Sequence, residues 1–471
     1  MQTRDAPPIR IGNGAGFWGD QIDAPLDLVR AGRLDVLTLE YLAELTLAIL
    51  SHLRAKDPRA GFVSDLPDLL VRLVPELRIQ QRLRIVTNGG GLNPRACAAR
   101  CGEILAASEM GTRCIAVVDG DDVLSRIPEW IAAGIELANL ETGEPIATVA
   151  DRLLAAHVYL GAPLIAEALA GGAQLVLTGR VADASLALGP AAAWFGWSWT
   201  DWDVLAGGTA AGHLIECGAQ VTGGLWEEWD QLPGLAGMGY PIAEIASDGS
   251  SVITKPEGSG GRVSPPIVAE QLLYEIGDPT CYRTPDVDVD FTAVQLIDQG
   301  PDRVSVTGAR GRPPSDHLKL AAIFQDGWTA SGLLAVVGAG AEKRARRAGA
   351  VILERLGRGG FAPEASLVEC LGAGDVVGGV VRPVSPPFEV LLRVTVRDSS
   401  RAKVERFCRE LAPLVTSGPP GIAGYAAGRP SPRPAFGYWP ALVPRALVEP
   451  RLEIRPAADW TRETCGRPVQ K

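Results

Sequence analysis

The sequence predicts an α/β protein with an N-terminal parallel, Rossmann-like βαβ sheet and an α+β second half. Over the first half of the chain, short apolar runs alternate with amphipathic helical segments, which is typical of βαβ units. Each run stops abruptly at glycine or polar residues, as buried parallel strands do where they enter loops. Beyond Gly224 the pattern changes to short strands mixed with Gly, Ser and Pro, which indicates α+β structure.

The apolar runs give the expected strands of the parallel sheet. These are Ile9–Ile11, Asp35–Glu40, Leu83–Gly90, Cys114–Asp122 and Leu175–Leu177. In open α/β sheets, ligands bind along the edge formed by the carboxyl ends of the strands. We therefore expect a group of strand-end residues to gather at that edge: Gly14, Glu40, Asn88, Asp119 and Arg180.

Periodicity also predicts helices over Ala150–Tyr159, Pro163–Ala170 and Ala341–Gly357, the last of them cationic. Residues 318–338 resemble a β-hairpin. The proline-rich residues 381–388 suggest a joint.

Three segments are expected. Residues 1–235 form an α/β glycine-loop domain with the candidate site, residues 236–380 an α+β part, and residues 381–471 a βα unit with a Pro/Gly-rich tail.

Composition excludes several classes of protein. The chain has 471 residues, 46% of them hydrophobic, and a net charge of −10, which argues against a general nucleic-acid binder. No apolar run reaches the roughly 18 residues of a membrane helix, and no signal peptide is evident. Eight cysteines without a CxxC pair fit reduced thiols, so we expect a cytoplasmic protein. Cys97 and Cys101 have no second matched pair, so no metal site is predicted.

The loop after the first strand matches GxGxxG through Gly14, Gly16 and Gly19. Such a loop can cradle a pyrophosphate, with Glu40 at the next strand end as a ribose-binding acid. The bulk of Phe17 and the charge of Asp20 argue against this, and the alternative is a tight turn that positions Asp20.

Two further strand ends offer groups for binding an anion. Asn88, Gly89 and Gly90 can present backbone N–H groups to an anion, or simply lead into a helix that Asn93 caps.

Thr178 and Arg180 follow the strand Leu175–Leu177, and Arg180 suits bidentate recognition of carboxylate or phosphate. The alternative for Arg180 is an ion pair with Asp183 inside the loop.

A polar cluster follows in residues 208–224. If 210–220 is a helix, one face carries four polar side chains: His213, Glu216, Cys217 and Gln220. His213 and Glu216 can then act as an acid/base pair, with Asp183 as a further candidate. They can equally be a paired set of core residues. No further ligand stands at zinc spacing, and we expect Cys217 to be a neighbour rather than a nucleophile. Lys255, beside the glycine-rich residues 256–261, is either an anion contact or part of a flexible hairpin end.

Several long blocks resemble the acyclic terpene utilisation (AtuA-like) family. They include IGNGAGFWGD, RIVTNGGGLNP, LTGRVADAS, GTAAGHLIECGAQVTGG and YWPALVP, in the family's order and over nearly the whole chain. The resemblance implies bacterial catabolism of acyclic isoprenoids through branched acyl-CoA thioesters, with a lyase step suggested. Longer relatives continue into a small C-terminal domain, so a separate small protein is a candidate partner.

Our hypothesis is therefore a cytoplasmic enzyme, expected to be a homo-oligomer, that acts on a carboxylate or branched acyl-CoA. Carbon–carbon or carbon–oxygen lyase chemistry comes first and hydrolysis second, with no cofactor required on sequence grounds. In this hypothesis Arg180 and Lys255 hold the anionic group while His213, Glu216 or Asp183 moves a proton. The alternatives are a non-catalytic subunit that binds a small partner protein, and a dinucleotide-dependent enzyme through Gly14, Gly16 and Gly19.

Overall fold

The computed structural model describes residues 6–378, 380 and 385–461. They form two compact units, one from residues within 1–323 and 438–471 and the other from 324–437. The expected boundary at 235 falls inside the first unit and the one at 380 inside the second, while the segment 381–471 is shared between the two. Of the expected joint 381–388, residues 381–384 lie outside the described residues.

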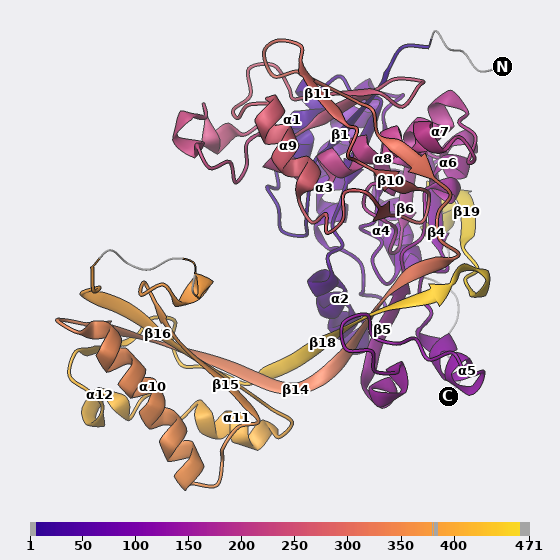
Figure 1. Ribbon diagram of the computed structural model, residues 1–471. Coiled ribbons are helices and arrows are strands. Elements are labelled where there is room, and N and C mark those ends of the chain that lie inside the picture. Colours follow the sequence, from indigo (N-terminus) through magenta and orange to yellow (C-terminus); the bar gives the residue numbers. More distant parts are fainter. Residues whose placement is uncertain (1–5, 379, 381–384, 462–471) are drawn as a thin grey trace. The chain divides into compact units, whose positions relative to one another are not determined.

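The first unit is built on a large mixed sheet (Figure 1). In spatial order its strands are β11 (Gln295–Asp298), β12 (Val304–Thr307), β8 (Ser251–Thr254), β7 (Ile242–Ile245), β1 (Ile9–Asn13), β2 (Val36–Leu39), β3 (Arg84–Thr87), β6 (Leu175–Thr178), β4 (Cys114–Asp119) and β19 (Arg451–Pro456). Strands β1, β2, β3, β6 and β4 run parallel to their neighbours in this group, which confirms the predicted fold class. On either side the sheet is extended by antiparallel strands.

Smaller strands and helices complete this unit. The strands are β5 (Leu153–Val158), β9 (Tyr282–Arg283), β10 (Asp288–Asp290) and β13 (Arg310–Arg312). The helices are α1 (Ala24–Ala31), α2 (Glu44–Lys56), α3 (Asp65–Ile79), α4 (Pro94–Ala107), α5 (Ile127–Ala132), α6 (Pro163–Ala170), α7 (Ser185–Phe195), α8 (Trp202–Glu216), α9 (Pro265–Leu273) and α13 (Ala457–Trp460). Among the described residues no helix is both long enough and apolar enough to span a membrane.

The predicted helix over Ala150–Tyr159 is wrong, because this segment holds β5. Its Leu and Ala residues favour a helix locally, but β5 instead pairs with the long strand β14 (His317–Val337). Pairing with a distant strand overrides such a weak local preference. The helix expected over Pro163–Ala170 is confirmed as α6.

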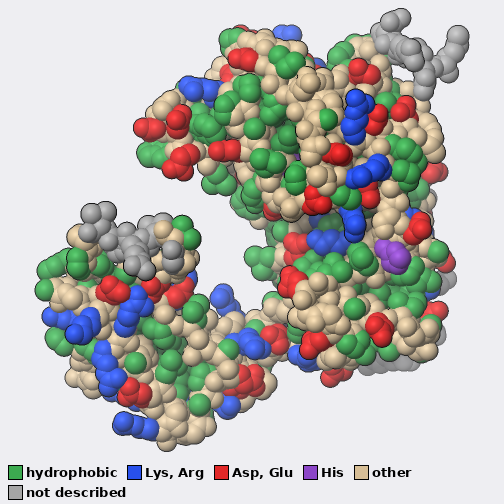
Figure 2. Space-filling view, in the orientation of Figure 1, with side chains coloured by type: hydrophobic (Ala, Val, Ile, Leu, Met, Phe, Trp, Pro, Cys, Tyr) green, Lys and Arg blue, Asp and Glu red, His purple; other side chains and the backbone are tan. Residues whose placement is uncertain are grey.

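The second unit is a smaller sheet covered by helices. Strands β15 (Ala365–Leu371), β16 (Glu389–Asp398), β14 and β17 (Ile422–Tyr425) lie side by side, and β18 (Arg433–Pro444) also pairs with β14. The helices are α10 (Ala341–Arg358), α11 (Arg401–Phe407) and α12 (Leu414–Ser417). Apolar residues of α10, such as Ile352 and Leu356, pack with strand residues such as Leu392. The opposite side of α10 carries the row of basic side chains visible in Figure 2, as the sequence predicts.

The predicted hairpin over residues 318–338 is also wrong, because β14 runs through it as one strand. Gly327 takes a positive φ of 80°, and a Cβ there would lie 2.6 Å from the carbonyl oxygen of Asp398. Gly327 therefore marks a close approach of β14 to its neighbouring strand β16 and not a turn.

Candidate active site

The first unit contains a cavity of about 720 Å³ at the carboxyl edge of its parallel strands. Volumes of this size are typical of small-molecule sites. Glu40 follows β2, Arg180 follows β6, and His213 and Glu216 lie in the last turn of α8, and all four line the cavity. The structure thus brings Arg180 and the His213–Glu216 pair to one space.

Glycines in α8 allow its close packing against α7. A Cβ on Gly212 would lie 2.5 Å from the carbonyl oxygen of Ala184, and one on Gly208 would lie 2.8 Å from the side chain of Leu188. Only glycine tolerates such close approach. Gly208 and Gly212 therefore allow α8 to lie close to α7, and the last turn of α8, with His213 and Glu216, lies at the cavity.

Arg180 is the buried centre of an ion network. Its Nη2 lies 2.7 Å from Oδ1 of Asp183 and its Nη1 lies 3.5 Å from Oε1 of Glu40, with the side chain only 3% exposed. Nη1 also donates to the carbonyl of Leu42, and the guanidinium stacks 4.1 Å from the ring centroid of Tyr159. The ion pair with Asp183 is thus present, and Arg180 faces the cavity as well. Within the described part of the chain its Nε has no hydrogen-bond partner.

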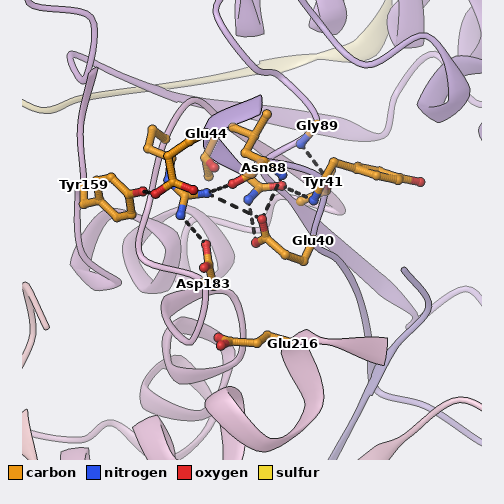
Figure 3. A network of polar contacts seen from close by, with 12 residues as sticks. Glu40, Tyr41, Glu44, Asn88, Gly89, Tyr159, Asp183 and Glu216 are labelled. Atoms are coloured by element: carbon orange, nitrogen blue, oxygen red, sulfur yellow. Dashed lines mark hydrogen bonds and ion pairs between the residues drawn. The ribbon is translucent and has the colours of Figure 1, made fainter. Parts of the chain in front are cut away.

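Two acids beside Arg180 hold protons more tightly than usual. Burial and the nearby charge of Asp183 raise the pKa of Glu40 well above its ordinary value, although Arg180 opposes this. Burial likewise raises the pKa of Asp183, again against the effect of Arg180. Oε2 of Glu40 accepts a 2.5 Å hydrogen bond from Asn88 (Figure 3). One guanidinium thus faces two carboxyl groups that repel each other.

Glu44 and Lys319, which the sequence did not indicate as site residues, also line the cavity. Glu44, at the start of α2, accepts a hydrogen bond from Tyr159 at 2.8 Å (Figure 3). It also accepts one from Tyr438 at 3.4 Å and lies 3.3 Å from Nζ of Lys319. Burial opposes the shift, but Lys319, the hydrogen bond from Tyr159 and the charge of Arg180 lower the pKa of Glu44 to about 2. The sequence carries no signal for Lys319, because it reaches the cavity on β14, far along the chain from Arg180.

His213 and Glu216 form a buried pair one helical turn apart. Nδ1 of His213 lies 3.1 Å from Oε1 of Glu216, while Nε2 faces the carbonyl oxygen of Leu272 at 3.3 Å. A carbonyl only accepts, so Nε2 carries a hydrogen and Nδ1 shares its proton with Glu216. The imidazole packs between Tyr282 and Phe291, with ring centroids 5.5 Å and 5.9 Å away.

The pKa of Glu216 lies close to neutral pH. Burial raises the pKa of Glu216 to about 7, against the hydrogen bond from His213, which lowers it. Its Oε2 has no hydrogen-bond partner among the residues the structure describes. In Figure 3 Glu216 lies apart from the Arg180 network. A carboxyl oxygen is therefore left for a ligand.

Cys217 lines the same cavity without the features of a nucleophile. Burial and the neighbouring charge of Glu216 raise the pKa of its thiol, so it stays protonated. This agrees with its expected place as a neighbour of the acid/base pair.

In the GxGxxG loop the backbone N–H of Gly16 is hydrogen-bonded to Asp20, the residue that directly follows the motif. The carboxylate of Asp20 accepts from the backbone N–H of Gly16 at 2.8 Å and from that of Gln21 at 2.7 Å, and Tyr240 donates to it. Asp20 thus takes the position near Gly16 that an anion would occupy. A Cβ on Gly16 would lie 2.7 Å from the carbonyl carbon of Cys217, so this glycine lets the loop touch the end of α8.

Eight of the predicted site residues do not line this cavity: Gly14, Gly19, Asn88, Gly89, Gly90, Asn93, Thr178 and Lys255. Asn88 is buried, donates a hydrogen bond to Oε2 of Glu40 and accepts one from the backbone N–H of Tyr41. Gly89 packs against Tyr41, and Gly90 packs against Pro94 and the carbonyl of Thr178. Gly14, Gly19 and Thr178 also lie outside the lining, and Asn93 caps α4 at a second cavity.

Lys255 is not at the cavity either. Its Nζ lies 2.8 Å from the carbonyl oxygen of Ser259 and 3.0 Å from Oδ2 of Asp302. The lysine thereby ties β8 to the glycine-rich loop that follows it.

The mouth of the cavity is apolar and partly strained. Phe17, Leu225 and Leu442 line it with exposed side chains, Leu225 being 86% exposed. Leu225 and Glu275 take positive φ values of 65° and 61°, which are unfavourable for residues other than glycine. Strained backbone of this kind is concentrated at functional sites.

Among the described residues, no cluster of three or more His, Cys, Asp or Glu side chains suits a metal ion. The fold and site together describe a mixed α/β protein with a polar, ionisable cavity at its sheet edge. The chain belongs to the acyclic terpene utilisation family, whose model, described as acyclic terpene utilisation family protein AtuA, matches residues 9–454. No curated protein and no solved structure matches it.

Proposed function

We propose that this protein is an enzyme that acts on a carboxylate or branched acyl-CoA substrate by lyase chemistry, in isoprenoid or related small-acid metabolism. Membership of the acyclic terpene utilisation family supports the metabolic setting. The observation that carries the proposal is Glu216, a buried carboxyl group with a pKa near 7 and a free oxygen in the cavity. Acid/base catalysts work best when their pKa lies near the operating pH.

The His213–Glu216 pair acts as the proton-transfer group. With Nε2 of His213 held by the carbonyl of Leu272, the pair shares one mobile proton between Nδ1 and the carboxyl group. When Nδ1 holds that proton, Glu216 is a carboxylate whose Oε2 can accept a proton from substrate. His213 then donates to Oε1 and serves as a positioning residue that steadies the charge on Glu216.

Two cations in the lining of the same cavity, Arg180 and Lys319, suit a substrate carboxylate or a developing enolate. Nε of Arg180 lacks a partner among the described residues, and Lys319 is 44% exposed at the cavity. A buried guanidinium stabilises negative charge strongly because little water screens it. Arg180 supplies a fixed charge, and Lys319 can move from Glu44 to the ligand.

The same groups serve both forms of lyase chemistry. In carbon–carbon cleavage Glu216 takes the proton of a substrate hydroxyl, a carbonyl forms, and the cations hold the enolate that leaves. In carbon–oxygen cleavage Glu216 takes the proton next to the carbonyl, and the hydroxyl group departs as water after receiving a proton from an acid such as Asp183. Both steps need one base and one stabilised oxyanion.

A two-stage experiment tests this proposal. A thermal-shift screen with branched acyl-CoAs and hydroxy acids first finds a ligand, since binding to the native state raises the melting temperature. Turnover of that ligand is then compared in Glu216→Gln, in His213→Gln and in the control Cys217→Ala. Loss of about 10²-fold in the first two with an active control supports the proposal, and full turnover in both contradicts it.

A further inference from the structure

A second cavity, of about 610 Å³, lies in the first unit where the parallel sheet ends at β4. It is lined by the glycine turn after β3, the start of α4, the acidic residues after β4 and residues 447–451. The proposed chemistry at Glu216 uses none of these residues.

His157, near the end of β5, lines this cavity, and one of its ring nitrogens has no hydrogen-bond partner among the described residues. Its side chain is 1% exposed, and its Nδ1 lies 2.7 Å from Oδ2 of Asp121. Nε2 on the opposite edge of the ring has no hydrogen-bond partner within the described residues. Burial alone would lower the pKa of His157, but the hydrogen bond to Asp121 outweighs it and raises the pKa. Because Nδ1 faces the carboxylate of Asp121, protonation of the ring leaves a buried N–H at Nε2 that needs an acceptor.

Helix α4 starts at the same cavity. Asn93 accepts a hydrogen bond from the backbone N–H of Ala96 at 3.3 Å, and Pro94 has no N–H, so the N–H of Arg95 lies at the open first turn. The positive end of a 14-residue helix favours negative charge.

Arginines neutralise the acids that line this space. Nη1 of Arg54 lies 3.0 Å from Oδ2 of Asp122, and Nε of Arg95 lies 3.0 Å from Oδ2 of Asp119. Arg126, which pairs with Glu129, and Arg451 also line the cavity, as does Glu449. Four arginines (Arg54, Arg95, Arg126 and Arg451) thus balance four acidic residues (Asp119, Asp121, Asp122 and Glu449), and protonation of His157 gives the lining one positive charge in excess.

We propose that this second cavity binds a phosphoryl group, with Nε2–H of His157, the first turn of α4 and the surrounding arginines as its donors. Several donors converging from a helix start and cationic side chains fit a tetrahedral oxyanion. The group is either inorganic phosphate or the phosphate of a larger ester. This site is independent of the proposed lyase chemistry.

Calorimetric titration of the full chain at constant ionic strength tests the site, with inorganic phosphate as one ligand and adenosine monophosphate as the other. The variants are His157→Gln and the double variant Arg126→Gln/Arg451→Gln, whose side chains are more exposed and whose folding is safer. Arg310→Gln, an exposed arginine outside this cavity, is the matched control. Circular dichroism verifies that each variant is folded.

We expect phosphate affinity to fall at least tenfold in His157→Gln and in the double variant, and to stay unchanged in Arg310→Gln and Glu216→Gln. Tighter binding of the nucleotide than of phosphate identifies an ester as the ligand, and the reverse identifies the free ion. The site is overturned if neither ligand binds at tens of millimolar, if the folded variants bind as well as the wild type, or if Glu216→Gln alone abolishes binding.

Discussion

His213 and Glu216 lie 3.1 Å apart, from Nδ1 to Oε1, in the last turn of α8, and both are buried at the cavity. Because the carbonyl of Leu272 engages the other ring nitrogen, the pair has a single proton to exchange.

Glu216→Gln should lower kcat by about 10²-fold or more, because the amide cannot accept a proton from substrate. Single-turnover measurements with a substrate found by screening test this. Glu275→Gln, a carboxyl group at the rim of the same cavity, is the matched control and should retain activity. Equal losses in both variants would point to a general charge effect and against a base at Glu216.

The activity should depend on pH through the same pair. Burial raises the pKa of Glu216 to about 7, so the basic form grows as the pH rises through that value. We expect kcat/KM to fall tenfold per pH unit below about pH 6 and to level off above about pH 8. This acidic limb of the pH profile reports the titration of His213 and Glu216 as a coupled pair. A limb that persists unchanged in Glu216→Gln would assign the titration to another group.

As the pH rises, the stability of the folded protein should fall while its activity increases. Glu216 binds its proton more tightly in the folded chain than at its ordinary pKa of 4.5. Its contribution to the free energy of unfolding is therefore fully present below about pH 4.5 and is lost as the pH rises through about 7.

Glu216→Gln removes this titration. We expect the variant to gain about 1 kcal/mol or more over the wild type at pH 8 relative to pH 5, or about 2 °C in Tm. Differential scanning calorimetry at the two pH values measures this difference. A constant offset between the two proteins would contradict the raised pKa.

Arg180→Met should destabilise the first unit by about 3–5 kcal/mol, because it leaves Glu40 and Asp183 buried beside each other without their cation. Urea unfolding followed by tryptophan fluorescence measures the loss. The exposed pair Arg310–Asp203 gives the control, and Arg310→Met should cost less than about 1 kcal/mol. Similar losses in the two variants would show that Arg180 is not the centre of the network.

Lys319→Met tests the anion contact without disturbing the core, since its side chain is 44% exposed. If Lys319 moves from Glu44 to the substrate carboxylate, KM should rise about tenfold with a smaller change in kcat. Lys343→Met on α10 is the control for loss of a surface cation. An unchanged KM would show that Lys319 does not bind the substrate carboxylate.

Gly16→Ala tests why the glycine loop exists. The added methyl would lie 2.7 Å from the carbonyl carbon of Cys217, so we expect a loss of about 2 kcal/mol or more and reduced turnover. Gly237→Ala, with open space around it, should be close to neutral. A dinucleotide that binds the wild type and is lost in Gly16→Ala would revive the cofactor interpretation of the loop.

The sequence by itself determined the parallel core and its polar edge. Each strand is an apolar run that stops at a polar or glycine residue, and this local pattern was sufficient to bring Glu40 and Arg180 to the same edge. The helical spacing of His213 and Glu216 is also local, and their pairing follows from it.

Tertiary structure alone decided which of these groups share a cavity. Lys319 and Glu44 meet beside Arg180 only because β14 passes the start of α2, and Lys255 instead meets Asp302. Strand pairing between distant segments turned the expected helix over Ala150–Tyr159 into β5 and brought residues 451–456 back beside β4. Such contacts depend on the burial of surfaces far apart along the chain, and local residue patterns do not record which surfaces will meet.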